Sequence, residues 1–194
     1  MIINHKQQFV FICVAKTAST SIRSVLTSNP DPIPPIYHMH LEDVLQQHPK
    51  AASYFKFGFV RNPYDRIVSL YHDLKYNTQH SSWAYPIYTY NFEEFVRGIY
   101  EGNLPPSEYN WIHMDTQFSY LKQAENIGVD YVGKFENLIP DWLTICEMIG
   151  IAPTPLQKCR TSCHDSYQSY YDQETKNMVY QTYQDDFEMF GYTK

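Results

Sequence analysis

The sequence predicts an α/β fold in which helices flank a central, mostly parallel sheet, built as one domain over residues 1–194. Two observations support this prediction. Short runs rich in Phe, Val and Ile, typical of strands buried on both faces, occupy residues 9–15 and 56–60, and a third strand is predicted at residues 130–134. Each of these strands precedes a segment whose apolar residues recur at helical spacing. Strands that alternate with helices indicate a parallel sheet, and no repeat or Gly/Ser-rich linker divides the chain.

The first strand ends in a run of small polar residues and one lysine at positions 16–21. The next segment, from Ser19 or Thr20 to Leu26, carries apolar residues at helical spacing, so residues 16–21 are predicted to form a strand-to-helix turn. Four prolines within residues 30–35 predict a loop, because proline lacks the amide hydrogen that regular elements need.

The second strand leads into a helix that is predicted to run from Pro63 to about Tyr76. Asn62 suits the N-cap of this helix, and proline suits its first position. Three more helices are predicted at residues 41–48, at residues 140–149 and from Asp172 onward.

The chain is acidic overall, with 15 Lys and Arg residues, 21 Asp and Glu residues and a net charge of −6 at pH 7. This charge excludes nucleic-acid binding driven by a basic field over the whole surface, so an anionic ligand must be held by a local cluster of cations. The apolar run at residues 9–15 is far shorter than the roughly 20 residues that cross a bilayer. No secretory signal is visible at the N-terminus. We therefore expect a cytoplasmic protein without a membrane span.

The four cysteines lie at positions 13, 146, 159 and 163. A reducing compartment disfavours disulfides between them. Cys159, Cys163 and His164 are residue types that bind metals, but no second pair of ligands lies at the spacing of a zinc site. The sequence therefore predicts no metal site.

The first candidate anion site is the turn at residues 16–21, where a buried strand gives way to a helix. Backbone N–H groups and the helix dipole face an anion at such a turn, and here the Lys16 ammonium and four hydroxyl groups surround it. A Walker A loop would need two glycines that this turn lacks, so an Mg²⁺-dependent nucleotide loop is a poor match. The alternative interpretation is a polar helix cap with a solvated lysine.

A second candidate anion site begins with Arg61, which also follows a strand. Ligands of α/β sheets bind beyond the carboxyl ends of the strands. On the following helix, Asn62, Arg66 and Ser69 share one face. The Arg61 guanidinium at the strand end and the Ser69 hydroxyl two turns into the helix suit one phosphate. The alternative interpretation is a solvated helix face with an ion pair to a neighbouring aspartate, which explains Arg66 better than Arg61.

Residues 9–22 (FVFICVAKTASTSI) and 55–71 (FKFGFVRNPYDRIVSLY) resemble a known pair of loops. They are similar to the 5′-phosphosulfate and 3′-phosphate loops of sulfotransferases that use 3′-phosphoadenosine 5′-phosphosulfate (PAPS), in particular the carbohydrate-type family 2. The likeness extends over most of the chain and includes Thr116-Gln117, residues 131–138 and residues 183–192. It implies a P-loop-like α/β fold.

The resemblance also implies a role for each residue of the two loops. Lys16 would contact the bridging oxygen and neutralise charge as the sulfuryl group leaves, while Arg61 and Ser69 would hold the 3′-phosphate. The 5′-phosphate would lie against the rest of the first loop, namely Thr17, Ala18, Ser19, Thr20 and Ser21. The chain departs from the family at Ala15, where proline is usual, and at Ser19, where glycine is usual. The second departure predicts an altered loop, because serine disfavours backbone conformations that glycine permits.

His38 and His40 lie where members of this family commonly carry a histidine base, and His40 aligns better. A group that titrates near neutral pH suits removal of the proton from an acceptor hydroxyl. If this segment is extended, alternation places both rings on the same side, so either residue is a candidate base. The alternative interpretation is a surface histidine.

The resemblance suggests further acceptor or nucleotide contacts from Gln117 and from a C-terminal loop with Lys158, Arg160 and Ser162. The aromatic-rich residues 83–90 are candidates either for a sugar-binding cleft or for loop packing.

The sequence thus predicts an enzyme that moves a sulfuryl group from PAPS, its co-substrate, to a hydroxyl acceptor, expected to be a carbohydrate, without a metal. The alternatives are a P-loop kinase or nucleotide-hydrolysing enzyme, and a non-catalytic relative that binds a nucleotide or a glycan. The sequence indicates no oligomeric state.

Overall fold

The computed structural model describes residues 1–28, 38–76, 87–104, 112–157 and 165–194. The chain divides into two units. The first comprises Met1–Arg61 and Gln117–Arg160, and the second comprises Asn62–Thr116 and Thr161–Lys194.

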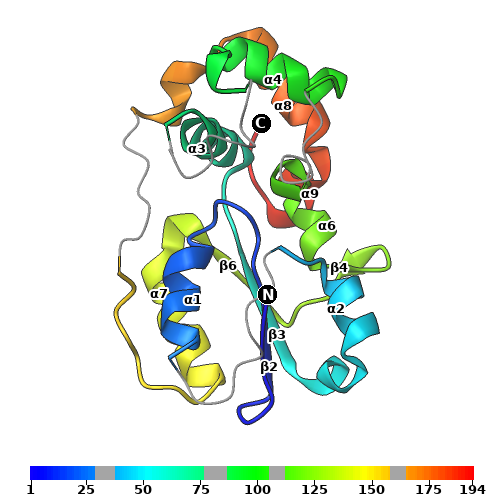
Figure 1. Cartoon of the computed structure of the whole chain (residues 1–194), viewed down its shortest axis with the longest axis vertical. Helices are drawn as coiled ribbons and strands as arrows, with labels where there is room; N and C mark the ends of the chain where they lie inside the picture. The colour runs from blue at the N-terminus through cyan, green and yellow to red at the C-terminus, as the bar shows by residue number, and fades with distance from the viewer. Residues whose placement is uncertain (29–37, 77–86, 105–111, 158–164) are drawn as a thin grey trace. The chain divides into compact units, whose positions relative to one another are not determined.

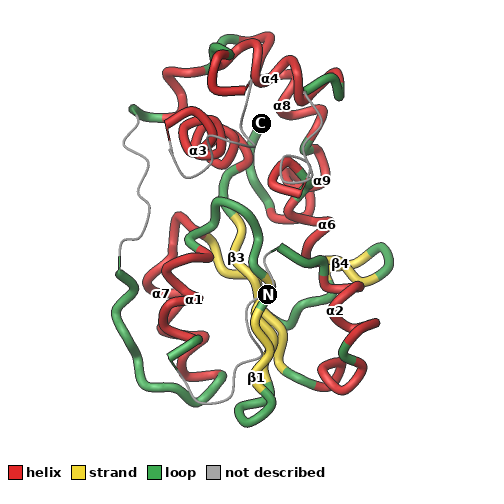
Figure 2. Tube along the Cα trace, in the orientation of Figure 1, coloured by secondary structure: helices red, strands yellow, loops and turns green. Residues whose placement is uncertain are grey.

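The first unit is built on a four-stranded sheet with the order β1-β2-β3-β6, drawn in yellow in Figure 2. Its strands are β1 (Ile2–Asn4), β2 (Phe9–Ile12), β3 (Phe55–Val60) and β6 (Tyr131–Lys134). β2, β3 and β6 are parallel, and β1 pairs antiparallel with β2. The prediction of a mostly parallel sheet is therefore confirmed, and β1 is a strand that the sequence patterns did not indicate.

β2 ends three residues earlier than predicted, because the chain turns once it leaves the sheet. The Val14 amide donates a hydrogen bond to the Ile12 carbonyl over 3.2 Å, which closes a tight turn. Residues 13–15 are nevertheless buried, as their apolar side chains require.

Helices cover both faces of this sheet, as predicted. α1 (Ser19–Leu26) and α7 (Leu138–Met148) lie on one side of the strands in Figure 1, and α2 (Leu41–Gln47) lies on the other. Ile22 of α1 and Trp142 of α7 belong to one buried cluster with Phe57 and Phe59 of β3. On the opposite face, the Leu121 side chain of α6 (Gln117–Leu121) lies close to the backbone of Gly58. A Cβ atom at position 58 would lie only 2.5 Å from Cδ2 of Leu121. A small hairpin of β4 (Lys122–Gln123) and β5 (Asn126–Ile127) completes the unit.

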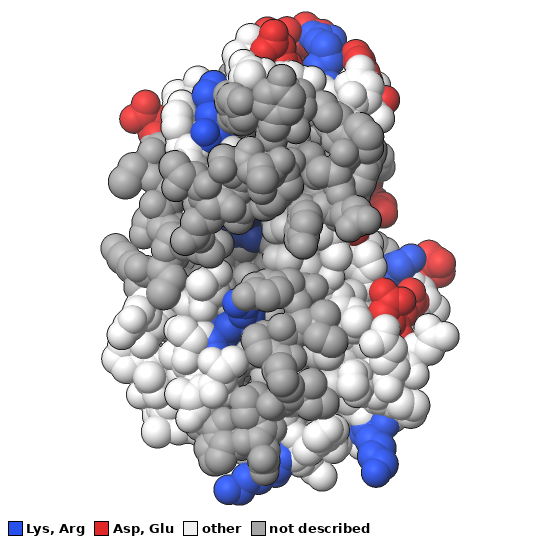
Figure 3. Space-filling view, viewed as in Figure 1, with Lys and Arg blue, Asp and Glu red and all other residues white. Residues whose placement is uncertain are grey.

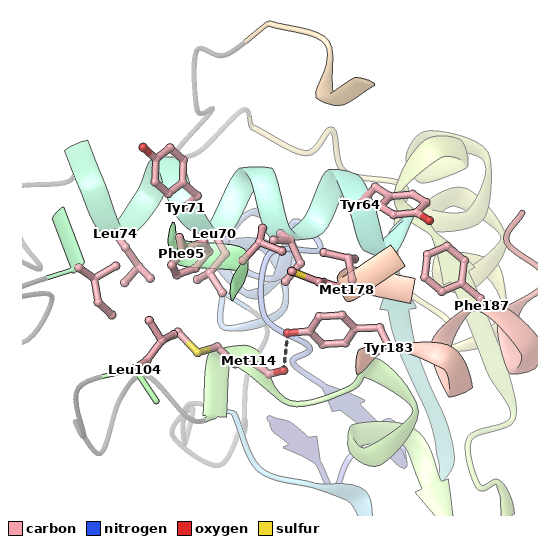
Figure 4. Packing of buried hydrophobic residues seen from close by; sticks show 14 residues of the cluster. Tyr64, Leu70, Tyr71, Leu74, Phe95, Leu104, Met114, Met178, Tyr183 and Phe187 are labelled. Atoms are coloured by element: carbon pink, nitrogen blue, oxygen red, sulfur yellow. Dashed lines mark hydrogen bonds between the residues drawn. The ribbon is translucent and has the colours of Figure 1, made fainter. Parts of the chain in front are cut away.

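The second unit is helical and surrounds a core of aromatic and aliphatic side chains, shown in Figure 4. Its helices are α3 (Pro63–Tyr76), α4 (Phe92–Glu101), α8 (Gln173–Thr182) and α9 (Gln184–Phe190). α3 has the predicted bounds. α8 begins after Asp172 as predicted, because the Asp172 carboxylate accepts a hydrogen bond from the Thr175 amide over 2.8 Å.

The predicted C-terminal helix is divided in two at Tyr183. This residue has a non-helical backbone conformation with φ −116°, and its hydroxyl donates a hydrogen bond to the Met114 carbonyl over 2.9 Å (Figure 4). Burial raises the pKa of the Tyr183 hydroxyl far above its usual value, so the group stays a neutral donor.

Arg66 lies in this core and not on a solvated helix face. Its side chain is 0% exposed. Nη2 donates to the Asp115 carbonyl over 2.7 Å and lies 4.0 Å from the Asp186 carboxylate, and the guanidinium stands 5.0 Å from the Tyr183 ring. The interpretation of Arg66 as part of a solvated helix face with an ion pair to a neighbouring aspartate is therefore wrong, because α3 is packed on the face that carries Arg66.

Candidate active site

The loop from β2 to α1 has an alternating backbone conformation. Lys16 (φ 67°) and Ala18 (φ 63°) are both in the left-handed region. Between them, Thr17 is buried, and its hydroxyl donates a hydrogen bond to the Val14 carbonyl over 3.1 Å. Such alternation turns successive backbone N–H groups toward one concave side, which is a binding site for anions.

α1 begins directly after this loop with Ala18 at its N-cap, and no side chain forms a cap hydrogen bond there. The first amide groups of a helix have no partner within the helix, so they are suited to an anionic ligand. Lys16, Ala18 and Thr20 are partly exposed, whereas Thr17, Ser19 and Ser21 are buried. The exposed residues of the loop are therefore the better candidates for direct contact.

Serine at position 19 does not strain the loop. Ser19 is the first residue of α1 and is not among the residues with positive φ. The left-handed conformations fall instead on Lys16 and Ala18. The expectation that a missing glycine at position 19 alters the loop is therefore not supported by the backbone, because the helical conformation there is open to any residue.

Arg61 follows β3, the strand beside β2, and its side chain reaches the first loop. Nη1 donates to the Lys16 carbonyl over 3.3 Å, and the guanidinium carbon lies 4.1 Å from the centre of the Phe135 ring. The main chain of Arg61 pairs with the Gln117 side chain. The structure thus brings Lys16 and Arg61 together at the carboxyl ends of the neighbouring parallel strands β2 and β3.

His38 and His40 both lie against Tyr120 of α6, at ring distances of 6.3 and 4.8 Å. Nδ1 of His38 is 2.9 Å from the Cys13 carbonyl. Because a carbonyl only accepts, Nδ1 carries a hydrogen, and in the neutral ring Nε2 holds the lone pair. His40 is the N-cap residue of α2, and its Nδ1 lies 3.7 Å from an oxygen of Asp43.

Several predicted site residues belong to the second unit or lie outside the described residues. Ser69 is buried on α3 in the second unit, so its role beside Arg61 stays a prediction from the sequence. Lys158, Arg160 and Ser162 lie outside the described residues, as do Cys159, Cys163, His164 and residues 83–86. Gln117 and Phe135 were not recognised as partners of Arg61, since both contacts depend on the folded chain.

Metal-binding residues do not gather in the described part of the chain, where no group of three or more His, Cys, Asp or Glu side chains forms a site. Cys13 and Cys146 are buried free thiols, and burial raises the pKa of both. No described helix is long and apolar enough to cross a membrane. On the face shown in Figure 3, the Lys and Arg residues that the structure describes form small separate patches.

Three comparisons relate the chain to known proteins. The model of the sulfotransferase family matches residues 1–193. Carbohydrate sulfotransferase 11 of Mus musculus is 28% identical over 171 residues, covering 74% of this chain and 48% of that protein. Carbohydrate sulfotransferase 10 of Danio rerio is 28% identical over 186 residues, covering 76% of this chain and 49% of that protein. The chain thus spans about half the length of the curated relatives it matches.

The crystal structure of mouse sulfotransferase SULT7A1 complexed with PAP has the same fold. It matches with a TM-score of 0.60 and 12% identity, over 95% of this chain and 86% of that chain. The likeness confirms the P-loop-like α/β architecture that the sequence predicted.

Proposed function

Because this chain belongs to the sulfotransferase family, we propose that it transfers a sulfuryl group from PAPS to a hydroxyl group of a carbohydrate. The observation that carries the proposal is the 3.3 Å contact between the Arg61 guanidinium and the Lys16 carbonyl, which joins two cationic residues at neighbouring strand ends. The names of the relatives, carbohydrate sulfotransferases 10 and 11, support a carbohydrate acceptor. The PAP in the SULT7A1 complex supports PAPS as the co-substrate.

The residues of the first unit fit the two charged ends of such a nucleotide. The concave backbone at Lys16 and Ala18, together with the first amides of α1, suits the 5′-phosphosulfate. Arg61 supplies a planar guanidinium for the 3′-phosphate, because its fork of donors matches two phosphate oxygens. Ser69 is the second residue for which the family resemblance implies a contact with the 3′-phosphate.

When bound, PAPS supplies the activated sulfuryl group. The acceptor oxygen forms a bond to sulfur while the bond between sulfur and the 5′-phosphate oxygen breaks, and the acceptor proton passes to a base. The Lys16 ammonium stabilises the negative charge that grows on the departing phosphate oxygen. Stabilisation of charge that develops only in the transition state raises the rate.

His40 and His38 are the two candidates for the base. His40 is favoured by its alignment with the family, and His38 is favoured by the Cys13 carbonyl, which orients its ring with Nε2 as the acceptor. If His40 is the base, His40→Ala should lose turnover. If His38 is the base, His38→Ala should lose it.

The test is transfer of labelled sulfate from PAPS to a panel of glycans. Wild-type protein should label at least one hydroxyl-bearing glycan, and Lys16→Ala should abolish the transfer. Lys6→Ala is the matched control, because Lys6 is exposed in the turn between β1 and β2. Binding of PAP without turnover on any glycan would favour a non-catalytic relative. Turnover of ATP that requires Mg²⁺ would favour the kinase interpretation. The cytoplasmic location stays a prediction from the sequence.

A further inference from the structure

Gln117 pairs with the main chain of Arg61 through both ends of its amide. Its Oε1 accepts a hydrogen bond from the Arg61 N–H over 2.8 Å, and its Nε2 donates to the Arg61 carbonyl over 2.8 Å. The side chain is 0% exposed. Gln117 therefore acts like one residue of an additional strand.

This pairing fills a gap at the end of the sheet. Val60, the last residue of β3, is matched with Lys134, the last residue of β6. Arg61 is the first residue beyond that ladder, and it is only 8% exposed. Buried backbone groups need partners, and here the Gln117 amide provides both of them. The backbone direction at Arg61 is thus fixed by a side chain from a distant part of the sequence.

The far end of Arg61 is fixed as well. Its guanidinium lies on the Phe135 ring and donates to the Lys16 carbonyl. Phe135 is held in turn, because the amide of the preceding Lys134 donates to the Asp141 carboxylate over 2.6 Å. The Arg61 guanidinium can bind two phosphate oxygens only in the direction in which its N–H groups point. Because both the main chain and the guanidinium of Arg61 are held, that direction is fixed.

We propose that Gln117 is a positioning residue that makes the protein selective for nucleotides with a 3′-phosphate. It does so through Arg61, since its own amide is buried and directed to the Arg61 main chain. The proposal rests on the proposed function, in which Arg61 binds that phosphate. This role differs from a general structural role, because displacement of Arg61 weakens the binding only of ligands that carry a 3′-phosphate.

The test compares PAP with AMP, which differs from PAP only by lacking the 3′-phosphate. Binding of both nucleotides is measured by titration calorimetry with wild-type protein and with Gln117→Met, which keeps the length of the side chain and removes both hydrogen bonds. A hydrogen bond to a charged group typically changes affinity about tenfold or more. We expect Gln117→Met to bind PAP at least about tenfold more weakly and to bind AMP within about twofold of wild type.

Two further variants complete the design. Gln123→Met makes the same substitution at an exposed position on β4 and should leave both affinities unchanged. Gln117→Glu retains the acceptor for the Arg61 N–H but, when ionised, has no donor for the Arg61 carbonyl. It should show an intermediate loss of selectivity, and it replaces Gln117→Met if that variant does not fold.

The outcomes separate the inference from the proposed function. If wild-type protein binds PAP no more tightly than AMP, the assignment of Arg61 to a 3′-phosphate fails, and the inference fails with it. If wild type prefers PAP and the Gln117 variants keep that preference, only the inference is overturned. Equal weakening of PAP and AMP would also overturn it, because that result indicates a general loss of structure.

Discussion

Ala18 has a backbone conformation that alanine disfavours, with φ 63° and ψ 17°. In this left-handed region the Cβ atom crowds a carbonyl oxygen, which costs an L-residue about 1–2 kcal/mol. Glycine lacks the Cβ atom and avoids this cost. Ala18→Gly should therefore increase the free energy of unfolding.

The gain is smaller than the strain it removes. Glycine adds about 0.4–1 kcal/mol of conformational entropy to the unfolded chain, so the net stabilisation should be about 0.5–1 kcal/mol. For a chain of this size, 1 kcal/mol shifts Tm by about 2–4 °C, and the expected rise is about 1–4 °C. Ala52→Gly is the control. Ala52 is exposed in the 3-10 helix Pro49–Ser53 and does not have positive φ, so the same substitution there should lower Tm.

Scanning calorimetry and urea unfolding measure both variants against wild type. A fall in Tm for Ala18→Gly that matches the fall for Ala52→Gly would refute the reasoning, because it would mean that the Ala18 conformation carries no strain. PAP affinity provides a second measurement. The backbone N–H groups of the loop are unchanged in Ala18→Gly, so that affinity should be retained. Ala18→Val places a β-branched side chain in the left-handed region and should lower both Tm and affinity.

Three further predictions concern turnover and the core. Lys16→Ala should lower kcat strongly and PAP affinity only weakly, because charge on the bridging oxygen develops mainly in the transition state. Steady-state kinetics measures the loss of kcat, and calorimetry measures the loss of affinity. An unchanged kcat would exclude Lys16 from the chemical step. Wild-type activity should fall on acidification, since neutral imidazole is the active base, and removal of the base should lower kcat roughly 100-fold and abolish that fall. Kinetics across pH on His40→Ala and His38→Ala identify the base, and if neither variant changes the profile, the base lies elsewhere. Arg66→Met should lower the free energy of unfolding by about 3–5 kcal/mol in urea titrations, because it leaves the Asp186 carboxylate buried without its cation; a loss below 1 kcal/mol would show that the pair contributes little.

The strands β2 and β3 were predictable from their composition. A strand that is buried on both faces is a short, nearly continuous apolar run without alternating polar residues, and both strands have this pattern. β1 has only three residues and depends on its pairing with β2, so it leaves no local pattern. α6 is likewise too short to show periodicity, with five residues.

The start of α4 has a sequence signal that the prediction did not include. The Asn91 side chain caps the helix, and the Asn91 backbone amide donates a hydrogen bond to the Glu94 carboxylate over 2.7 Å, which completes a capping box. An Asn followed three residues later by Glu before an apolar run is a recognisable start of a helix. Asp172 was recognised by the same kind of local signal, because capping involves residues only a few positions apart.

The burial of Arg66 could not be predicted from the local sequence pattern. Arginine is almost never fully buried unless it is paired, so the pattern around Arg66 favoured an exposed face. Its partners, the Asp115 carbonyl and the Asp186 carboxylate, lie 49 and 120 positions away in the chain. Gln117 was singled out as a candidate for acceptor or nucleotide contacts, but its pairing with the Arg61 main chain was not predicted, since 56 positions separate the two residues.

The candidate site shows why a concave strand-to-helix loop can form here without glycine. Two left-handed residues, Lys16 and Ala18, each cost about 1–2 kcal/mol, and two hydrogen bonds hold the strained turn. The Thr17 hydroxyl binds the Val14 carbonyl from within the loop, and the Arg61 guanidinium binds the Lys16 carbonyl from the neighbouring strand. A hydrogen bond from a charged donor contributes about 1.5–3 kcal/mol, which is of the same size as the strain. Because the support comes from Arg61, the loop is shaped before any ligand arrives, and a bound nucleotide need not order it.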